Sequence, residues 1–225
     1  MPAMLRSALI FIFAALAIVG AELGKEIGSA QYLHYTFKPL TTLSIFFFAW
    51  RSKPVISHSY QKAILAGIVC SLIGDIFLML PGTVFRQGFI CGLLSFLLAH
   101  ICFLRALLTD SRFAGQPLAF AGIAALGVIN LVILWPGLPS ALQIPVVAYV
   151  CLLLCMTAQA ISRGLQLRSM SGRLALIGGL CFMLSDTLLA YNRFYAPITH
   201  SPLLILSSYY LALWLIAASV TSSKE

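Results

Sequence analysis

Residues 62–80, KAILAGIVCSLIGDIFLML, form an almost unbroken apolar run that carries a single aspartate, Asp75, near its end. An apolar run of about 18 residues or more is long enough to cross the hydrocarbon core of a bilayer as a helix. An ionised carboxylate is costly there, so ionisable residues in such runs usually face a bundle interior or a wet cavity. The stretch therefore predicts a membrane-spanning helix with a candidate functional residue inside it.

The composition of the whole chain extends this prediction. Of the 225 residues, 61% are hydrophobic and 9% are charged, and the mean hydropathy is +1.01. Soluble domains carry about one-quarter charged residues. We therefore expect an all-α, polytopic integral membrane protein. The net charge of +8 is explained by basic residues between spans, and no Lys/Arg-rich run with interleaved aromatics indicates nucleic-acid binding.

Eight spans joined by short loops are expected, in one transmembrane bundle that covers residues 1–225. Their approximate ranges are 5–23, 31–50, 62–80, 87–108, 116–135, 141–161, 173–191 and 201–219. Turn chemistry marks three of the joints, at LPGT (80–83), WPGLPS (135–140) and APITHSP (196–202). The first run also fits a signal peptide cleaved after Ala21, but we favour a retained first span in a polytopic chain.

The distribution of basic residues predicts the orientation of these spans. With a cytoplasmic N-terminus, ten of the fourteen Lys and Arg residues fall on the cytoplasmic side. These ten are Arg6, Arg51, Lys53, Lys62, Arg105, Arg112, Arg163, Arg168, Arg173 and Lys224. Lys25, Arg86 and Arg193 fall outside, and Lys38 lies within a span. This bias predicts an even number of spans, both termini in the cytoplasm and a location in a bacterial inner membrane.

A second aspartate, Asp186, is expected at the same depth as Asp75. Asp75 follows Lys62 by thirteen residues, and Asp186 follows Arg173 by thirteen residues, on spans that run in the same direction. At about 1.5 Å per residue, both carboxylates lie about 20 Å from their basic anchors, in the outer half of the bilayer. The alternative is a structural helix–helix hydrogen bond, with Ser71 or Ser185 as partner.

Lys38 is the third unusual charge, and it belongs to a polar stripe. The stripe has helical spacing and consists of Gln31, His34, Tyr35, Lys38, Thr41 and Thr42. A lysine near the level of the two acids can pair with one carboxylate or hold a lipid phosphate. Snorkelling of the ammonium group to the interface is the alternative, although it does not account for the rest of the stripe.

Three further residues are candidates to support the acids. His100 lies deeper in its span and can orient a carboxylate or a catalytic water, whereas Tyr209 and Tyr210 lie near the level of the acids. Interhelical packing and hydrogen bonding are the alternatives for all three. The six cysteines are expected to be small buried hydrophobes, since none forms a CxxC pair. The four histidines show no metal-binding spacing, so no metal is predicted.

Ordered landmarks give the chain a family resemblance. They are FKPL (37–40), GDIFLML (74–80), FRQGFICGLLSFLLAHICF (85–103), CFMLSDTLLA (181–190) and SSYYLALWLIA (207–217). In this combination the chain resembles the YhhN/TMEM86 family of membrane lysoplasmalogenases over nearly its whole length. One departure is Leu213, where the family pattern often has Gln. Both aspartates, Lys38 and His100 are nevertheless in place.

The resemblance implies hydrolysis of the vinyl ether bond of lysoplasmalogens, with a lysophospholipid in the bilayer as substrate and no cofactor. The products are a fatty aldehyde and glycerophosphoethanolamine or glycerophosphocholine. Such a bond is hydrolysed by protonation on carbon, which gives an oxocarbenium-like cation that water attacks. A carboxylic acid in apolar surroundings can supply the proton, and an ionised carboxylate can stabilise the cation, much as two carboxylates do in glycosidases. The sequence leaves open which aspartate is the acid.

Two other functions also use aspartates within the membrane. An intramembrane aspartyl protease also uses two membrane aspartates, but its motif needs GxGD where this chain has LIGD (72–75), and the Ser185–Asp186 pair follows that motif rather than preceding it. A proton-coupled transporter could use the aspartates as a relay. Four spans in each half would give both halves the same orientation, unlike an inverted repeat.

Overall fold

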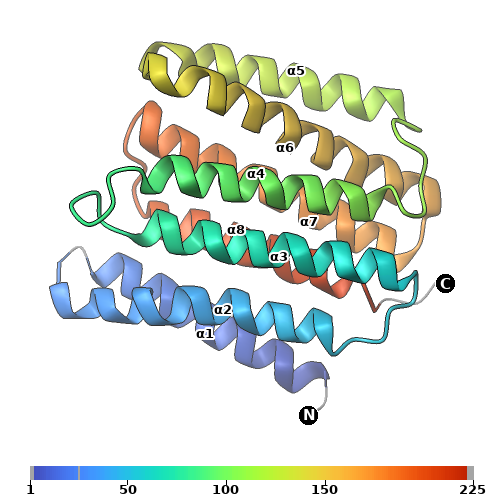
Figure 1. Cartoon of the computed structure of the whole chain (residues 1–225), viewed down its shortest axis with the longest axis horizontal. Helices are drawn as coiled ribbons and strands as arrows, with labels where there is room; N and C mark the ends of the chain where they lie inside the picture. The colour runs from blue at the N-terminus through green and yellow to red at the C-terminus, as the bar shows by residue number, and fades with distance from the viewer. Residues whose placement is uncertain (1–2, 25, 222–225) are drawn as a thin grey trace.

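The computed structural model describes residues 3–24 and 26–221, and the regular structure within these ranges is entirely helical (Figure 1). Eight α-helices coincide with the eight predicted apolar stretches. They are α1 (Ala3–Leu23), α2 (Gln31–Trp50), α3 (His58–Met79), α4 (Gly88–Leu107), α5 (Pro117–Leu134), α6 (Ser140–Leu167), α7 (Met170–Phe194) and α8 (Ser201–Ala218). Short 3-10 helices, η1 (Gly28–Ala30) and η2 (Trp135–Gly137), precede α2 and follow α5.

Seven of these helices are long and apolar enough to cross a membrane. The exception is α2, although with 20 residues it has a sufficient length. Its stripe of polar side chains lowers its hydropathy below that of the other helices. The prediction of an all-helical, multi-pass membrane protein is confirmed. The count of eight spans and the cytoplasmic position of the termini stay predictions.

Local chemistry explains where the helices begin and end. The hydroxyl oxygens of Ser57 and Ser169 accept hydrogen bonds from the backbone N–H groups of Tyr60 and Gly172, and so cap α3 and α7. Pro117 and Pro202 lie in the first turns of α5 and α8, where a missing N–H is tolerated. The three predicted turns lie between helices, at the α3–α4, α5–α6 and α7–α8 connections.

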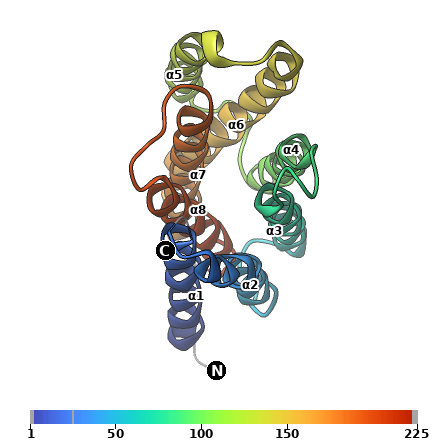
Figure 2. The same ribbon diagram turned by 90° about the vertical axis from the view of Figure 1, so that its left-hand side faces the viewer.

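The helices lie side by side along the longest axis of the molecule, and α1 begins at the same end at which α8 finishes (Figure 1). Seen from the end, α1 and α2 form one edge and α5 and α6 the other, with α3–α4 facing α7–α8 between them (Figure 2). Helix α8 packs against α1, α2, α3 and α7. Helices α3 and α7 run in the same direction, so their C-terminal halves, which carry the two aspartates, lie at the same end of the bundle (Figure 1).

Aromatic rings fill the space between the facing helix pairs. The Phe182 ring of α7 contacts Phe96 and Phe103 of α4 edge-on, with ring centroids 6.3 and 6.1 Å apart. Helix α3 comes close to these rings because it carries glycines there. A Cβ atom on Gly67 would lie 2.3 Å from the Phe103 ring, and one on Gly74 would lie 2.7 Å from the Phe96 ring. This close approach fixes the depth and rotation of α3, and hence the position of Asp75.

Two sequence-based expectations require correction. The predicted span at 141–161 ends too early, because α6 continues to Leu167, and Arg163, which the prediction places beyond that span, is fully buried. Its guanidinium makes two hydrogen bonds, of 2.7 and 2.9 Å, to the carboxylate of Asp110, and contacts Ser171 and the Tyr60 ring. Burial with a bidentate partner keeps the helix intact beyond the apolar run. The cysteines are less buried than expected: Cys151 is exposed and the other five are partly buried, although Cys70 and Cys181 pack against the hydrophobic core.

Candidate active site

Asp75 lies on α3, where three side chains from other helices surround its carboxylate. Its side chain is 2% exposed. Thr42 of α2 and Tyr209 of α8 each donate a hydrogen bond of 2.7 Å to Oδ2. The ammonium Nζ of Lys38, also on α2, lies 3.6 Å from Oδ1. A cation and two hydroxyl donors around one buried carboxylate are the contacts that an ionised form needs.

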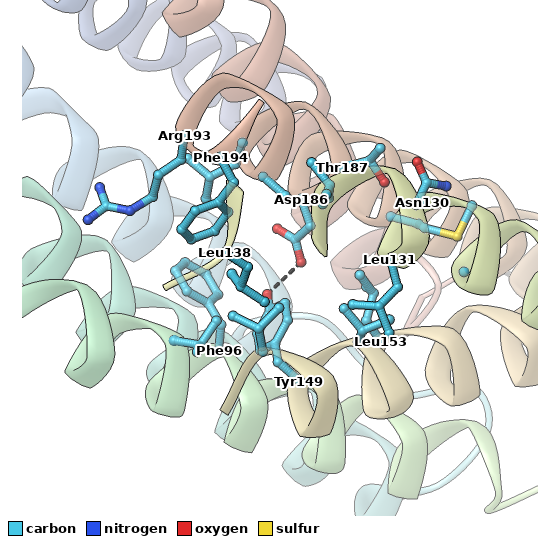
Figure 3. Close-up of a pocket in the computed structure, with 18 of the residues that line it drawn as sticks. Phe96, Asn130, Leu131, Leu138, Tyr149, Leu153, Asp186, Thr187, Arg193 and Phe194 are labelled. Atoms are coloured by element: carbon cyan, nitrogen blue, oxygen red, sulfur yellow. Dashed lines mark hydrogen bonds between the residues drawn. The ribbon is translucent and has the colours of Figure 1, made fainter. Parts of the chain in front are cut away.

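Asp186 lies on α7 in different surroundings. Tyr149 of α6 donates a hydrogen bond of 2.5 Å to its Oδ2, shown by the dashed line in Figure 3. His100 Nε2 of α4 lies 3.8 Å from the same oxygen, which is beyond hydrogen-bond distance. Neither ring nitrogen of His100 has a hydrogen-bond partner among the described residues. Within the part of the chain that the structure describes, Asp186 therefore has no Lys or Arg partner like that of Asp75, and its side chain is more accessible, at 12% exposed.

Both aspartates line one cavity of about 510 Å³, and the other residues of its lining come from α1, α2, α3, α4, α7 and α8. Its polar lining includes His34, Lys38 and Tyr209 in addition to the two acids. This volume falls in the range of small-molecule binding sites. The predicted common depth of Asp75 and Asp186 thus corresponds to a shared cavity, to which Lys38 also contributes.

A second, smaller cavity of about 100 Å³ meets the first at Asp186. Its lining is almost wholly apolar and comes from α3 to α7. Six residues line both cavities: Leu78, Phe89, Phe96, Asp186, Leu189 and Arg193. In Figure 3, Leu131 and Leu153 lie on one side of Asp186, whereas the guanidinium of Arg193 lies on the opposite side. The apolar cavity also reaches the outer surface of the bundle, because Leu126 in its lining is 48% exposed.

The remaining predicted residues take different places. His34 lines the polar cavity and its Nδ1 lies 3.1 Å from the backbone oxygen of Ala17. Tyr210 is buried beside Tyr209, but its hydroxyl has no hydrogen-bond partner in the described structure. Ser71 and Ser185 are not the partners of the aspartates. The Ser71 hydroxyl is unpaired, and Ser185 donates to the backbone oxygen of Ile205.

Two site residues were missed by the sequence analysis. Tyr149 was treated as one residue of an apolar span, although a tyrosine in mid-span needs a partner for its hydroxyl, and this is the signal that could have found it. Arg193 was assigned to topology alone, yet it lines both cavities. No sequence signal shows that this exposed side chain borders the two cavities, because this depends on how α7 packs against α4. Within residues 3–24 and 26–221, no three His, Cys, Asp or Glu side chains gather as a metal site would require.

The fold and the site define a multi-pass helical membrane protein in which carboxylates from two helices face one cavity within the bundle. The chain belongs to the YhhN family, whose model matches residues 33–220. The family resemblance drawn from the sequence landmarks is therefore confirmed. The region of the match contains Lys38, Asp75, His100, Tyr149, Asp186 and Arg193.

Named relatives extend across bacteria and mammals. The chain is 33% identical to human "Lysoplasmalogenase TMEM86A" over 195 residues, which cover 83% of this chain and 77% of the human protein. It is 31% identical to "Lysoplasmalogenase" of Mycobacterium tuberculosis over 139 residues, covering 60% of this chain and 51% of the relative. An "Uncharacterized membrane protein YhhN" of Escherichia coli is 33% identical over 107 residues, which cover 46% of this chain and 47% of the relative. No solved structure matches the chain significantly.

Proposed function

We propose that this protein is a lysoplasmalogenase that hydrolyses the vinyl ether bond of 1-alkenyl-glycerophosphoethanolamine or 1-alkenyl-glycerophosphocholine. The observation that carries the proposal is the position of Asp186, where a polar cavity meets an apolar one. In a lysoplasmalogen, the vinyl ether joins the polar glycerophospho group to the apolar chain. A lipid with its head group in the first cavity and the start of its chain in the second has this bond beside Asp186.

The surroundings of the two aspartates support different roles. Asp186 is the general acid, since no Lys or Arg of the described residues pairs with it and it lines both cavities. Asp75 is the ionised carboxylate, since Lys38, Thr42 and Tyr209 surround it. Tyr149 and His100 position the Asp186 side chain.

The proposed reaction proceeds in two stages. Asp186 transfers its proton to the second carbon of the alkenyl chain, and the π electrons of the double bond form the new C–H bond. The resulting oxocarbenium cation is stabilised by the negative charge of Asp75. Water adds to the first carbon and returns one proton to Asp186, and the hemiacetal then collapses to a fatty aldehyde and the glycerol hydroxyl. The reaction consumes only water, so it calls for no cofactor.

Names of relatives add independent support. Human and mycobacterial relatives at 31–33% identity carry the name lysoplasmalogenase.

Helix α2 supplies Lys38 and Thr42 to the site, so we place it across the bilayer as an eighth span, with both termini in the cytoplasm of a bacterial inner membrane. A C-terminal fluorescent-protein fusion should then fluoresce, and a C-terminal alkaline phosphatase fusion should be inactive. The reverse pattern would contradict this orientation.

Substrate comparison tests the activity. Purified protein should release aldehyde from a lyso-vinyl-ether lipid and should leave the matching lyso-alkyl lipid intact, because an alkyl ether has no double bond to accept the proton. The lyso-ester should be cleaved at least about 100-fold more slowly, since it needs nucleophilic attack rather than protonation on carbon. Equal cleavage of the ester would reject vinyl ether specificity. No aldehyde release, together with Asp75-dependent solute uptake in proteoliposomes, would favour the transporter.

A further inference from the structure

Arg193 is a cation at the mouth of the site for which the proposed chemistry has no use. It lies in the last turn of α7, and its guanidinium is stacked on the Phe89 ring of α4 with 3.9 Å between the Cζ atom and the ring centroid. Its other aromatic contact is Phe194, at 5.9 Å. Stacking on a ring fixes the plane of the guanidinium and leaves its N–H edge free for a hydrogen-bonding partner.

No carboxylate of the described residues pairs with this guanidinium. Asp75 pairs with Lys38, Asp110 pairs with Arg163, and the Asp186 oxygen is bonded to Tyr149. Glu22 is next to His200 and accepts a hydrogen bond from the Leu203 backbone. Arg193 is thus an exposed positive charge at the border of the two cavities, without a counter-ion among the described residues (Figure 3).

The charges that line the polar cavity do not balance when Asp186 carries its proton. Lys38 and Asp75 then compensate each other, and Arg193 remains as the excess positive charge. An anion in which two oxygens share one negative charge complements such a group, because a guanidinium can donate two parallel hydrogen bonds to them. The phosphodiester of a lysophospholipid has this charge and geometry.

We propose that Arg193 is the phosphate-binding residue of the site, and that it selects single-chain phospholipids over neutral ether lipids. This inference rests on the proposed function for the identity of the lipid. With the phosphate at Arg193, the glycerol lies in the polar cavity and the sn-1 oxygen faces Asp186, because Asp186 and Arg193 line both cavities. Arg193 is a substrate-binding residue here, and it takes no part in proton transfer.

Two lipids that differ only in the phosphate head group separate this role from a structural one. Aldehyde release should be measured with 1-alkenyl-glycerophosphoethanolamine and with 1-alkenyl-glycerol at equal surface concentration in mixed micelles. For Arg193→Gln, we expect kcat/KM on the phospholipid to fall about ten- to hundred-fold, as for loss of a charged hydrogen bond. On the neutral lipid it should stay within about twofold of the parent protein. Arg193→Lys should lose less, since it keeps the charge but not the two-donor edge.

Arg86 provides the matched control, because it is an exposed arginine in the α3–α4 loop that lines neither cavity. Arg86→Gln should leave both rates unchanged, and size-exclusion profiles should show that all variants are folded. An equal loss on both lipids for Arg193→Gln, or no loss on the phospholipid, would overturn the phosphate role.

A binding measurement separates this inference from the proposed function. If the parent protein releases no aldehyde from either lipid, the lysoplasmalogenase proposal fails. The phosphate site is then tested by native mass spectrometry with non-hydrolysable 1-alkyl-glycerophosphoethanolamine and 1-alkyl-glycerol. Binding of the phospholipid that weakens about ten- to hundred-fold in Arg193→Gln would support the site. Phospholipid binding that does not depend on Arg193, or no preference over the neutral lipid, would overturn it.

Discussion

Asp75 and Asp186 were predicted as a pair from depth alone, and their different surroundings come from residues distant in the sequence. Thr42, Tyr209 and Lys38 surround Asp75, whereas Tyr149 bonds Asp186. Counting residues from basic anchors gives the depth of a side chain but not the rotation of neighbouring helices. This is why the sequence indicated the two acids and Lys38 but missed Tyr149 and Arg193.

The buried Lys38–Asp75 pair gives a prediction at the scale of residues. Lys38→Met leaves the Asp75 carboxylate without its cation, which should lower the free energy of unfolding by about 3–5 kcal/mol. The double variant Lys38→Met/Asp75→Asn removes both charges, so it should regain most of that loss while remaining inactive. The interaction energy of the two charges is measured by thermal unfolding, in one detergent, of the parent protein, the two single variants and the double variant. Strictly additive losses would show that the two charges do not interact.

The range of α2 was predicted correctly from the sequence, whereas the end of α6 was not. The predicted range of α2, 31–50, agrees with the observed helix, because its apolar face is continuous over that length. Its polar stripe runs from exposed Gln31 through half-buried His34 to the buried Lys38, Thr41 and Thr42, so one face of this helix lines the site. Helix α6 was predicted too short, since hydropathy does not register the Arg163–Asp110 pair that holds its last turns.

The close approach of α3 to α4 is tested by adding one methyl group. In Gly74→Ala, the new Cβ would meet the Phe96 ring at 2.7 Å. We expect stability to fall by about 1–3 kcal/mol, and aldehyde release to fall with it because Phe96 lines both cavities. Gly82→Ala is the matched control, since no atom lies within 4 Å of its added Cβ. Unchanged melting temperature and activity in Gly74→Ala would contradict this packing.

At the scale of the whole molecule, the candidate site and a buried ion-pair network lie at opposite ends of the bundle. The site lies near the last turns of α3 and α7 and the start of α8. At the other end, Arg163 joins α6 to Asp110 after α4 and to Ser171 of α7, and Ser171 donates to the backbone oxygen of Ser219 after α8. This network could not be predicted from the sequence, because its members are far apart along the chain.

Removal of the carboxylate from this network should separate stability from activity. Asp110→Asn leaves the buried Arg163 without a counter-ion, so the free energy of unfolding should fall by about 3 kcal/mol. Because the network is remote from the cavities, kcat/KM at a temperature well below unfolding should stay within about twofold. Glu26→Gln, at an exposed position, serves as the control and should change neither quantity. A large loss of activity in folded Asp110→Asn protein would contradict the separation.

The central claim is that Asp186 transfers a proton to the second carbon of the alkenyl chain, and hydrolysis in ²H₂O tests it directly. The aldehyde product is reduced at once with borohydride, and mass spectrometry locates the deuterium in the resulting alcohol. As a control for exchange with solvent, fatty aldehyde added to the same mixture and reduced after the same interval should remain unlabelled. We predict one deuterium at that carbon with the parent protein, and a rate lowered by about 10²–10⁴-fold in folded Asp186→Asn protein. Aldehyde without deuterium, or an unchanged rate in Asp186→Asn, would contradict the account.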